Sequence, residues 1–209
     1  MIPKGIVFSQ SALLQTTRTG FISLSNINTN FMKTISLLLL LSLCFGLSSN
    51  AQDAKSAQDI LKEASQQAKK EKKKVFVMYH ASWCYWCHKM DDAMNDPSCK
   101  KFFDDNFVIV HLVTGEMQDK THLNTPGAEE TLAAHKGTGA GLPYWTFLDV
   151  DGKTLTDSRQ GETASTNIGC PATEEEVTTF MNKLKTVTKV PKKAYKAIFE
   201  RFRANEAKH

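Results

Sequence analysis

The stretch "HASWCYWCHK" (His80–Lys89) places two cysteines, Cys84 and Cys87, two residues apart, with His88 directly behind them. Two kinds of chemistry use such a pattern. Cys-x-x-Cys-His is the attachment motif of a c-type haem, and Trp-Cys-x-x-Cys at the end of a strand is typical of a redox-active dithiol. The motif therefore predicts either a bound cofactor or sulfur redox chemistry, and the rest of the chain decides between them.

The residues around the motif predict a strand that leads into a helix. The segment "KVFVMYHA" (Lys74–Ala81) is apolar, β-branched and aromatic, as in a buried strand. Cys84 would then lie at a helix N-terminus, where unpaired N–H groups stabilise a thiolate. We expect Cys84 to be the exposed nucleophile and Cys87 the shielded resolving thiol. His88 lies on the same helical face as Cys84, where it either modulates the pKa of Cys84 or simply lies at the rim.

The remaining segments predict the element order α-β-α-α-β-α-β-β-α-α. The first two strands are continuous apolar runs separated by helices, as in buried parallel strands, and the last two form a hairpin that turns at Asp151-Gly152. This order predicts an α/β fold with a four-stranded mixed sheet flanked by helices. The helices are expected at 54–72, in "HKMDDAM", in "SCKKFFDDN", at Ala128–His135, from the capping box of Thr173 and Glu176 to about Val187, and after Pro191; the strands at Lys74–Ala81, Phe107–Thr114 and in "YWTFLDVDGKTLTDSR"; and a loop at Gly161–Pro171.

Three segments, "VFVMYHASWCYWCHKM", "NDPSCKKFFDDNFVIVHLV" and "GLPYWTFLDVDGK", together resemble the thioredoxin superfamily. The chain is similar to exported thioredoxin-like proteins akin to the C-terminal domain of the bacterial transmembrane disulfide-interchange reductant. The resemblance implies a thioredoxin fold, here with an extra N-terminal helix and a C-terminal amphipathic helix. It also implies that Pro143 is a cis-proline facing the cysteine pair, and that the backbone of Leu142 pairs with an extended substrate segment. The segment before Pro143 is longer than in thioredoxin, which predicts an extra loop near the active face.

Two features depart from the pattern of thioredoxins proper. Those proteins carry an aspartate six residues before the first cysteine, and this chain has Met78 there, so the acid/base role is unfilled or passes to His88 or a water. The residues between the cysteines are Tyr85 and Trp86, and the lack of a histidine there argues against a strongly oxidising pair. We expect these two aromatic residues and Trp83 to form an apolar docking surface for the substrate.

The first 51 residues are expected to be a leader and signal peptide. The segment that begins at Met32 has a short basic start, an apolar core at Ile35–Leu47 and small residues before a cleavage site near Ala51-Gln52. That core is too short to span a bilayer comfortably. Met32 is thus the expected working start. The expected organisation is a leader at 1–51, an N-terminal helix at 52–73, a thioredoxin-like domain at 74–188 and a C-terminal amphipathic helix at 189–209.

Charge and composition indicate a globular protein without a nucleic-acid partner. The net charge is +4, but residues 1–51 hold three basic side chains and no acidic one, so 23 basic and 22 acidic side chains remain. An exported domain would reside in a secreted or periplasmic compartment, where disulfides persist. Cys99 and Cys170 either pair with each other or remain buried thiols. No stable membrane insertion is expected once the signal is removed.

These observations predict an exported thiol–disulfide oxidoreductase that acts on protein thiols and disulfides, more a reductant or isomerase than a strong oxidant. The Cys84–Cys87 dithiol needs no small-molecule cofactor and no metal, but a redox partner must reset it. The alternatives are a non-catalytic thioredoxin-fold binding module, a metal-binding dithiol, or a c-type haem protein, against which the strand-turn-helix context argues. The tail helix, whose apolar face includes Ile198 and Phe202, either packs on the domain or contacts a partner or membrane surface.

Overall fold

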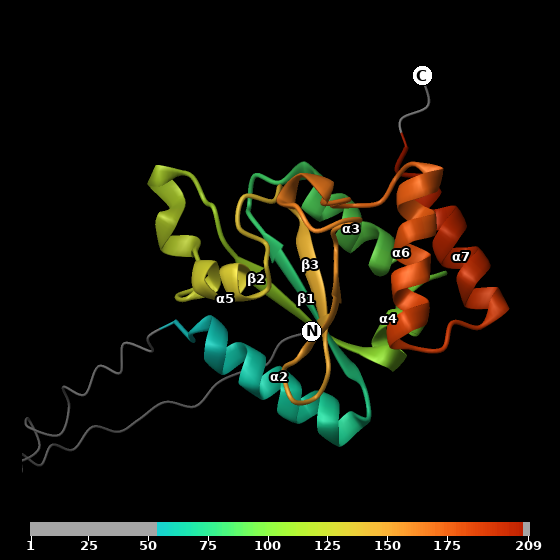
Figure 1. Ribbon diagram of the computed structural model, residues 1–209, viewed down its shortest axis with the longest axis horizontal. Coiled ribbons are helices and arrows are strands. Elements are labelled where there is room, and N and C mark those ends of the chain that lie inside the picture. The colour runs from blue at the N-terminus through green and yellow to red at the C-terminus, as the bar shows by residue number, and fades with distance from the viewer. Residues whose placement is uncertain (1–53, 207–209) are drawn as a thin grey trace, which may run out of the picture. The chain divides into compact units, whose positions relative to one another are not determined.

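Strand β1 (Lys74–His80), which leads into the cysteine motif, lies inside a four-stranded sheet with the order β2-β1-β3-β4 (Figure 1). The computed structural model describes residues 54–206. Strand β2 (Phe107–Val113) pairs with β1 in parallel, whereas β3 (Tyr144–Leu148) and β4 (Thr154–Asp157) continue the sheet in antiparallel pairs. The predicted mixed sheet of parallel first strands and a C-terminal hairpin is therefore confirmed.

Side chains of β1 alternate between two hydrophobic layers, because successive residues of a strand point to opposite faces. Val75, Val77 and Tyr79 pack on one face, and Phe76 and Met78 on the other, and all five are fully buried. Burial on both faces explains the continuous apolar run in the sequence. The helices on the Val75 face are α2 (Ala57–Glu71) and α5 (Ala128–Ala134).

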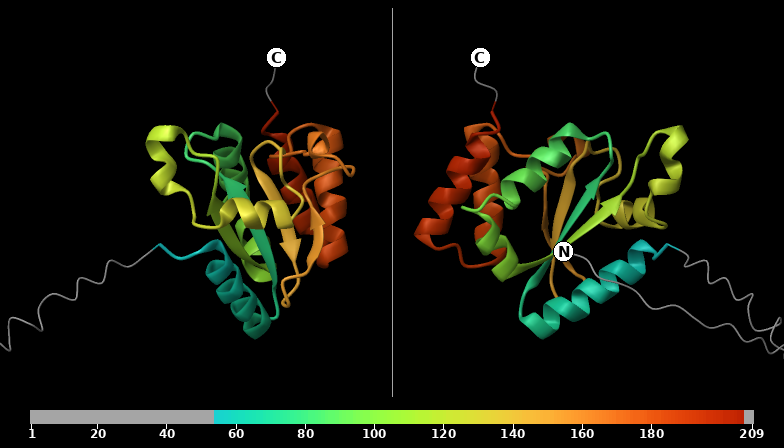
Figure 2. Two further views of the ribbon diagram at one scale, coloured as in Figure 1. Left: turned by 60° about the vertical axis from the view of Figure 1, so that its left-hand side comes forward. Right: turned by 180° about the vertical axis from the view of Figure 1, so that it is seen from behind.

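The opposite face of the sheet carries the larger, aromatic layer of the core. Phe76 and Phe147 have ring centroids 4.5 Å apart, and Phe180 and Phe202 extend the cluster outward with centroids 5.0 Å apart. The helices that pack on this side can be followed in Figure 2. They are α3 (Tyr85–Met94), α4 (Lys100–Asn106), α6 (Glu174–Val187) and α7 (Lys192–Arg203). The tail helix α7 thus packs on the domain, with Ile198 and Phe202 fully buried.

Local sequence signals explain where two of the helices begin. Thr173 accepts a hydrogen bond from the Glu176 N–H while the Glu176 carboxylate accepts one from the Thr173 N–H, which is the predicted capping box of α6. Ser56 caps α2 by accepting from the Asp59 N–H. On α2, Ala68 is fully buried in the core layer on the Val75 face of the sheet.

Two short 3-10 helices, η1 (Gln118–Leu123) and η2 (Ala164–Thr166), interrupt segments that were predicted as loops. Elements this short leave no periodic pattern in a sequence. The predicted leader at 1–51 lies outside the described residues. Within the described part of the chain, no helix combines the length and the apolar character needed to cross a membrane.

Candidate functional site

Cys84 and Cys87 are joined by a disulfide at the junction of β1 and α3. Cys84 is the N-cap residue of α3, and its Sγ lies 3.1 Å from the main-chain nitrogen of Cys87, which donates to it. In the reduced protein this N–H and the helix N-terminus would stabilise a thiolate on Cys84. The junction therefore brings together the predicted nucleophile and a group that stabilises its reactive form.

Both cysteines are buried, which corrects the expectation that Cys84 is exposed. Cys84 is 3% exposed and Cys87 is fully buried. Ala81 packs beside the disulfide, and Leu142, which is distant in the sequence, packs against the same cluster. The side chains around the motif take the exposed positions instead: Trp83 is 50% exposed, Tyr85 61% and Trp86 43%.

The Leu142–Pro143 peptide bond is cis, and an asparagine holds the segment around it. The side-chain amide of Asn167 donates to the Gly141 carbonyl at 2.6 Å and to the Pro143 carbonyl at 3.2 Å. The main-chain groups of Leu142 make no hydrogen bond to any other residue in the 54–206 range. Leu142 therefore lies beside the disulfide with main-chain groups that no other described residue hydrogen-bonds. Its neighbours on both sides, Gly141 and Pro143, are held by Asn167.

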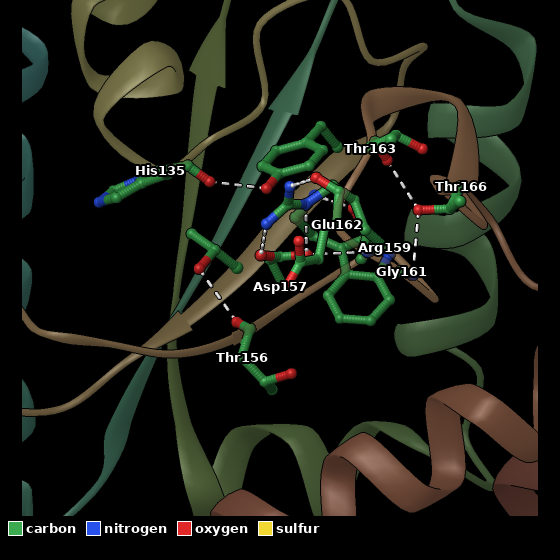
Figure 3. A network of polar contacts seen from close by, with 12 residues as sticks. His135, Thr156, Asp157, Arg159, Gly161, Glu162, Thr163 and Thr166 are labelled. Atoms are coloured by element: carbon green, nitrogen blue, oxygen red, sulfur yellow. Dashed lines mark hydrogen bonds and ion pairs between the residues drawn. The ribbon is translucent and has the colours of Figure 1, made fainter.

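The segment that carries Asn167 is fastened to β4 by an ion pair. Arg159 places Nη2 2.7 Å and Nε 3.0 Å from the carboxylate of Asp157, and its Nη1 donates to the Glu162 carbonyl (Figure 3). Burial alone would raise the pKa of Asp157, but the hydrogen bonds and charge of Arg159 outweigh it and the pKa lies below its usual range. Thr166 closes the turn by accepting from the Gly161 N–H at 3.0 Å. The segment that the sequence predicts as a loop, Gly161–Pro171, therefore has a defined structure.

A groove of about 540 Å³ lies between this segment and the segment before Pro143. Its lining includes Trp86, Leu142 and Asn167. Two of the four residues predicted to bind substrate, Trp86 and Leu142, therefore line the same groove. Trp83 and Tyr85 do not line it. The indole N–H of Trp83 instead donates to the Gly115 carbonyl at 3.0 Å, and the Tyr85 ring faces the Lys89 ammonium at 5.4 Å.

The position of the missing aspartate is filled by Met78, which is fully buried, and a carboxylate approaches the motif from elsewhere. Glu116, 8% exposed, accepts hydrogen bonds from both the N–H and the hydroxyl of Ser82, the hydroxyl bond being 2.7 Å long. His88 places Nε2 3.1 Å from the Ser82 carbonyl oxygen. Sequence reasoning missed Glu116. The available signal was its place just after β2, because the carboxyl ends of parallel strands meet at one edge of a sheet.

Cys99 and Cys170 are both buried free thiols, which decides the alternative left open by the sequence. Burial raises the pKa of Cys170 to about 12, and that of Cys99 is also raised. The amide nitrogen of Asn205 lies 3.5 Å from Cys170 Sγ. These two thiols have the character of inert core residues.

Alkylation should therefore spare Cys170 in the folded protein. Because its pKa of about 12 compares with an ordinary value of 9.0, the thiolate fraction at pH 8 falls about 1000-fold, and iodoacetamide should modify it correspondingly slowly. Mass spectrometry of native and guanidinium-unfolded samples would measure both rates. Similar rates in the two samples, or a peptide linking Cys99 to Cys170, would contradict the assignment.

The described residues show no group of three histidine, cysteine, aspartate or glutamate side chains arranged to hold a metal ion. What the site does contain is a Cys-x-x-Cys disulfide at a strand-to-helix junction, opposite the segment before a cis-proline. On a sheet of the order β2-β1-β3-β4, with helices on both faces, these features define a disulfide-carrying thioredoxin fold.

Comparison with known proteins agrees with this class. Residues 56–149 match the family model described as thioredoxin-like. The disulfide bond reductase DsbH of Chlamydia pneumoniae is 32% identical over 97 residues, which cover 44% of this chain and 56% of the relative. Part of the chain is therefore similar to thioredoxin-like proteins and to a disulfide bond reductase. The chain nevertheless spans little more than half the length of that relative.

Solved structures give more distant likenesses. A disulphide isomerase from Xylella fastidiosa Temecula1 is 16% identical with a TM-score of 0.44, covering 76% of this chain and 98% of the other. The oxidised C-terminal domain of DsbD from Neisseria meningitidis is 22% identical with a TM-score of 0.36, covering 50% of this chain and 84% of the other.

Proposed function

We propose that this protein is a thiol–disulfide oxidoreductase that reduces or isomerises disulfides of other proteins through Cys84 and Cys87. The observation that carries the proposal is the disulfide at the N-terminus of α3, lying beside a Leu142 peptide unit that no other described residue hydrogen-bonds. Reversible sulfur chemistry and a place to hold an extended chain are thereby combined in one site. The relative named disulfide bond reductase supports the same direction.

The proposed reaction exchanges two disulfides in sequence. The Cys84 thiolate attacks one sulfur of a substrate disulfide, forming a mixed disulfide while the bonding electron pair leaves on the other substrate sulfur, which takes up a proton. The Cys87 thiol then loses its proton and attacks Cys84 Sγ, which releases the second substrate sulfur as a thiol. The substrate gains two electrons and two protons, and the enzyme is left with the disulfide seen in the structure.

Binding would place the substrate chain along Leu142, with the groove receiving residues on one side of its disulfide. Trp86 borders both the cysteine motif and the groove, so its exposed ring is suited to cover the reacting sulfur atoms. Trp83 and Tyr85 would extend the apolar surface on the far side of the motif. No small-molecule cofactor enters the proposed cycle, but a partner protein must supply electrons to reduce Cys84–Cys87 again.

We further propose that the domain works outside the cytoplasm, after removal of a leader. The apolar core at Ile35–Leu47 and the small residues before Gln52 support this proposal. Sequencing the N-terminus of the protein recovered from its native host tests it: a chain starting at or near Gln52 in a secreted or periplasmic fraction is expected. A cytoplasmic chain that still carried residues 32–51 would contradict it.

Reduction of insulin disulfides, with dithiothreitol as electron donor, tests the proposed activity. We expect turnover well above the uncatalysed rate, and a Cys84–Cys87 potential nearer to roughly −270 mV than to the roughly −120 mV of the strong oxidant, because no charged residue separates the cysteines. Failure to accelerate the reduction would favour a non-catalytic binding module. A Soret band in protein made with a haem-maturation system would favour the haem alternative.

A further inference from the structure

The segment that follows β2 is attached to the residues that precede Cys84. The Thr114 N–H donates to the His80 carbonyl at 2.9 Å, and the Trp83 indole donates to the Gly115 carbonyl at 3.0 Å. Glu116 completes the attachment by accepting both polar hydrogens of Ser82. Three successive residues after β2 thus contact the last residue of β1 and two residues of the turn that leads to the disulfide.

Glu116 is also held from its own side. The Glu116 N–H donates to the Asn124 side-chain oxygen at 3.1 Å. The two ends of the loop are joined by a hydrogen bond from the Thr125 N–H to the Val113 carbonyl at 2.9 Å. Gly115 has a φ of +70°, a left-handed conformation that glycine adopts without strain and that turns the chain so that Glu116 meets Ser82. The carboxylate is therefore fixed in place rather than free on a surface loop.

The charge of this carboxylate is maintained at neutral pH. The Ser82 N–H lowers the pKa of Glu116, burial opposes this, and the Ser82 hydroxyl, Lys120 and His80 add to the lowering. The other titratable groups on this side are His88, which faces Ser82, and His111, whose Nε2 lies 2.7 Å from Asp91. The pKa of His80 is lowered, mainly by burial and next by His111, which favours its neutral form.

We propose that Glu116 is a positioning residue that fixes the Ser82–Cys84 turn and keeps a negative charge next to the dithiol, which makes the pair more reducing. The carboxylate is bonded to Ser82, which lies two residues before Cys84 in the chain. A negative charge there opposes formation of the Cys84 thiolate, and destabilising the thiolate favours the disulfide over the dithiol. The loop after β2 thereby supplies a charge that the Met78 position in the strand does not. This inference deepens the proposed function and rests on it only in requiring that Cys84 and Cys87 cycle between disulfide and dithiol.

The test is the equilibrium of Cys84–Cys87 with dithiothreitol, together with the pKa of the Cys84 thiol in the reduced protein. Glu116→Gln keeps the size of the side chain and removes its charge. We expect the equilibrium constant to move at least about threefold toward the dithiol, about 14 mV, and the Cys84 pKa to fall. Glu116→Asp, which keeps the charge, should stay closer to wild type than Glu116→Gln does.

Glu129→Gln, which removes an exposed carboxylate at the start of α5, is the matched control and should change neither quantity. Glu116→Ala is a second neutral variant, so whichever neutral variant folds decides the question. A folded neutral variant with the equilibrium constant and thiol pKa of the Glu129→Gln protein would overturn the proposal. The dithiothreitol equilibrium is measured without a protein substrate. Inactivity of the wild type toward insulin would therefore refute the proposed function, while the effect of Glu116 on the Cys84–Cys87 equilibrium could still be interpreted.

Discussion

Cys84→Ser protein should lose the reduction of insulin disulfides by on the order of 10³-fold or more, because removal of a covalent nucleophile leaves only the background reaction. The serine hydroxyl at the N-cap of α3 can still accept the Cys87 N–H, so the helix start is preserved and folding should be little affected. Initial rates with dithiothreitol measure the loss. Cys99→Ala, which removes a buried thiol outside the motif, is the control and should retain activity.

Cys87→Ser should separate the roles of the two sulfur atoms. If Cys84 attacks and Cys87 resolves, this variant accumulates mixed disulfides between Cys84 and substrate proteins, whereas Cys84→Ser accumulates few. Non-reducing electrophoresis followed by peptide mapping identifies the linked cysteine. Adducts formed equally well by both variants would show that the assignment of nucleophile and resolving thiol is wrong. Because Cys84 is only 3% exposed, the experiment also tests whether the small accessible part of the residue is enough for attack.

Features carried by local sequence were predictable here, and features that depend on distant segments were not. The apolar run of β1 and the capping box of α6 are each encoded within a few residues, and both were predicted correctly. The burial of Cys84 was not, because Leu142 covers the disulfide from a segment more than fifty residues away. Glu116 was missed for the same reason. Its contact with Ser82 exists only because parallel pairing of β1 with β2 brings their carboxyl ends together.

Within the site, too, the locally encoded cysteine pair could be predicted from the sequence, whereas the role of Asn167, which depends on distant contacts, could not. The spacing of Cys84 and Cys87 was sufficient to predict the pair, since three residues in a helical turn bring two side chains within reach. The role of Asn167 could not be predicted, because its segment read as an unstructured loop. The pairing of Arg159 with Asp157, the Gly161–Thr166 hydrogen bond and the short helix η2 give that segment its structure, and Asn167 bonds from it to Gly141 and Pro143.

Phe202→Ala should lower the free energy of unfolding by about 3–5 kcal/mol, the usual result of removing a fully buried phenylalanine. The Phe202 ring lies 5.0 Å from that of Phe180 and 6.5 Å from that of Phe103, measured between centroids, so it joins α7 to α6 and α4. A chain of this size changes its melting temperature by about 2–4 °C for each kcal/mol. Thermal melting followed by circular dichroism should therefore show a drop of about 6–20 °C.

Phe199→Ala provides the matched comparison, because Phe199 lies on the same helix, is only partly buried and stacks on Tyr195 at 6.0 Å. Its loss should cost about 1 kcal/mol, the typical effect of a single substitution. A large difference between the two variants would establish α7 as part of the domain core, as opposed to a helix kept for a partner or a membrane surface. Equal and small effects would contradict that conclusion. The Cys84–Cys87 potential should be the same in both variants, since α7 supplies no group that bonds to the cysteine motif among the described residues.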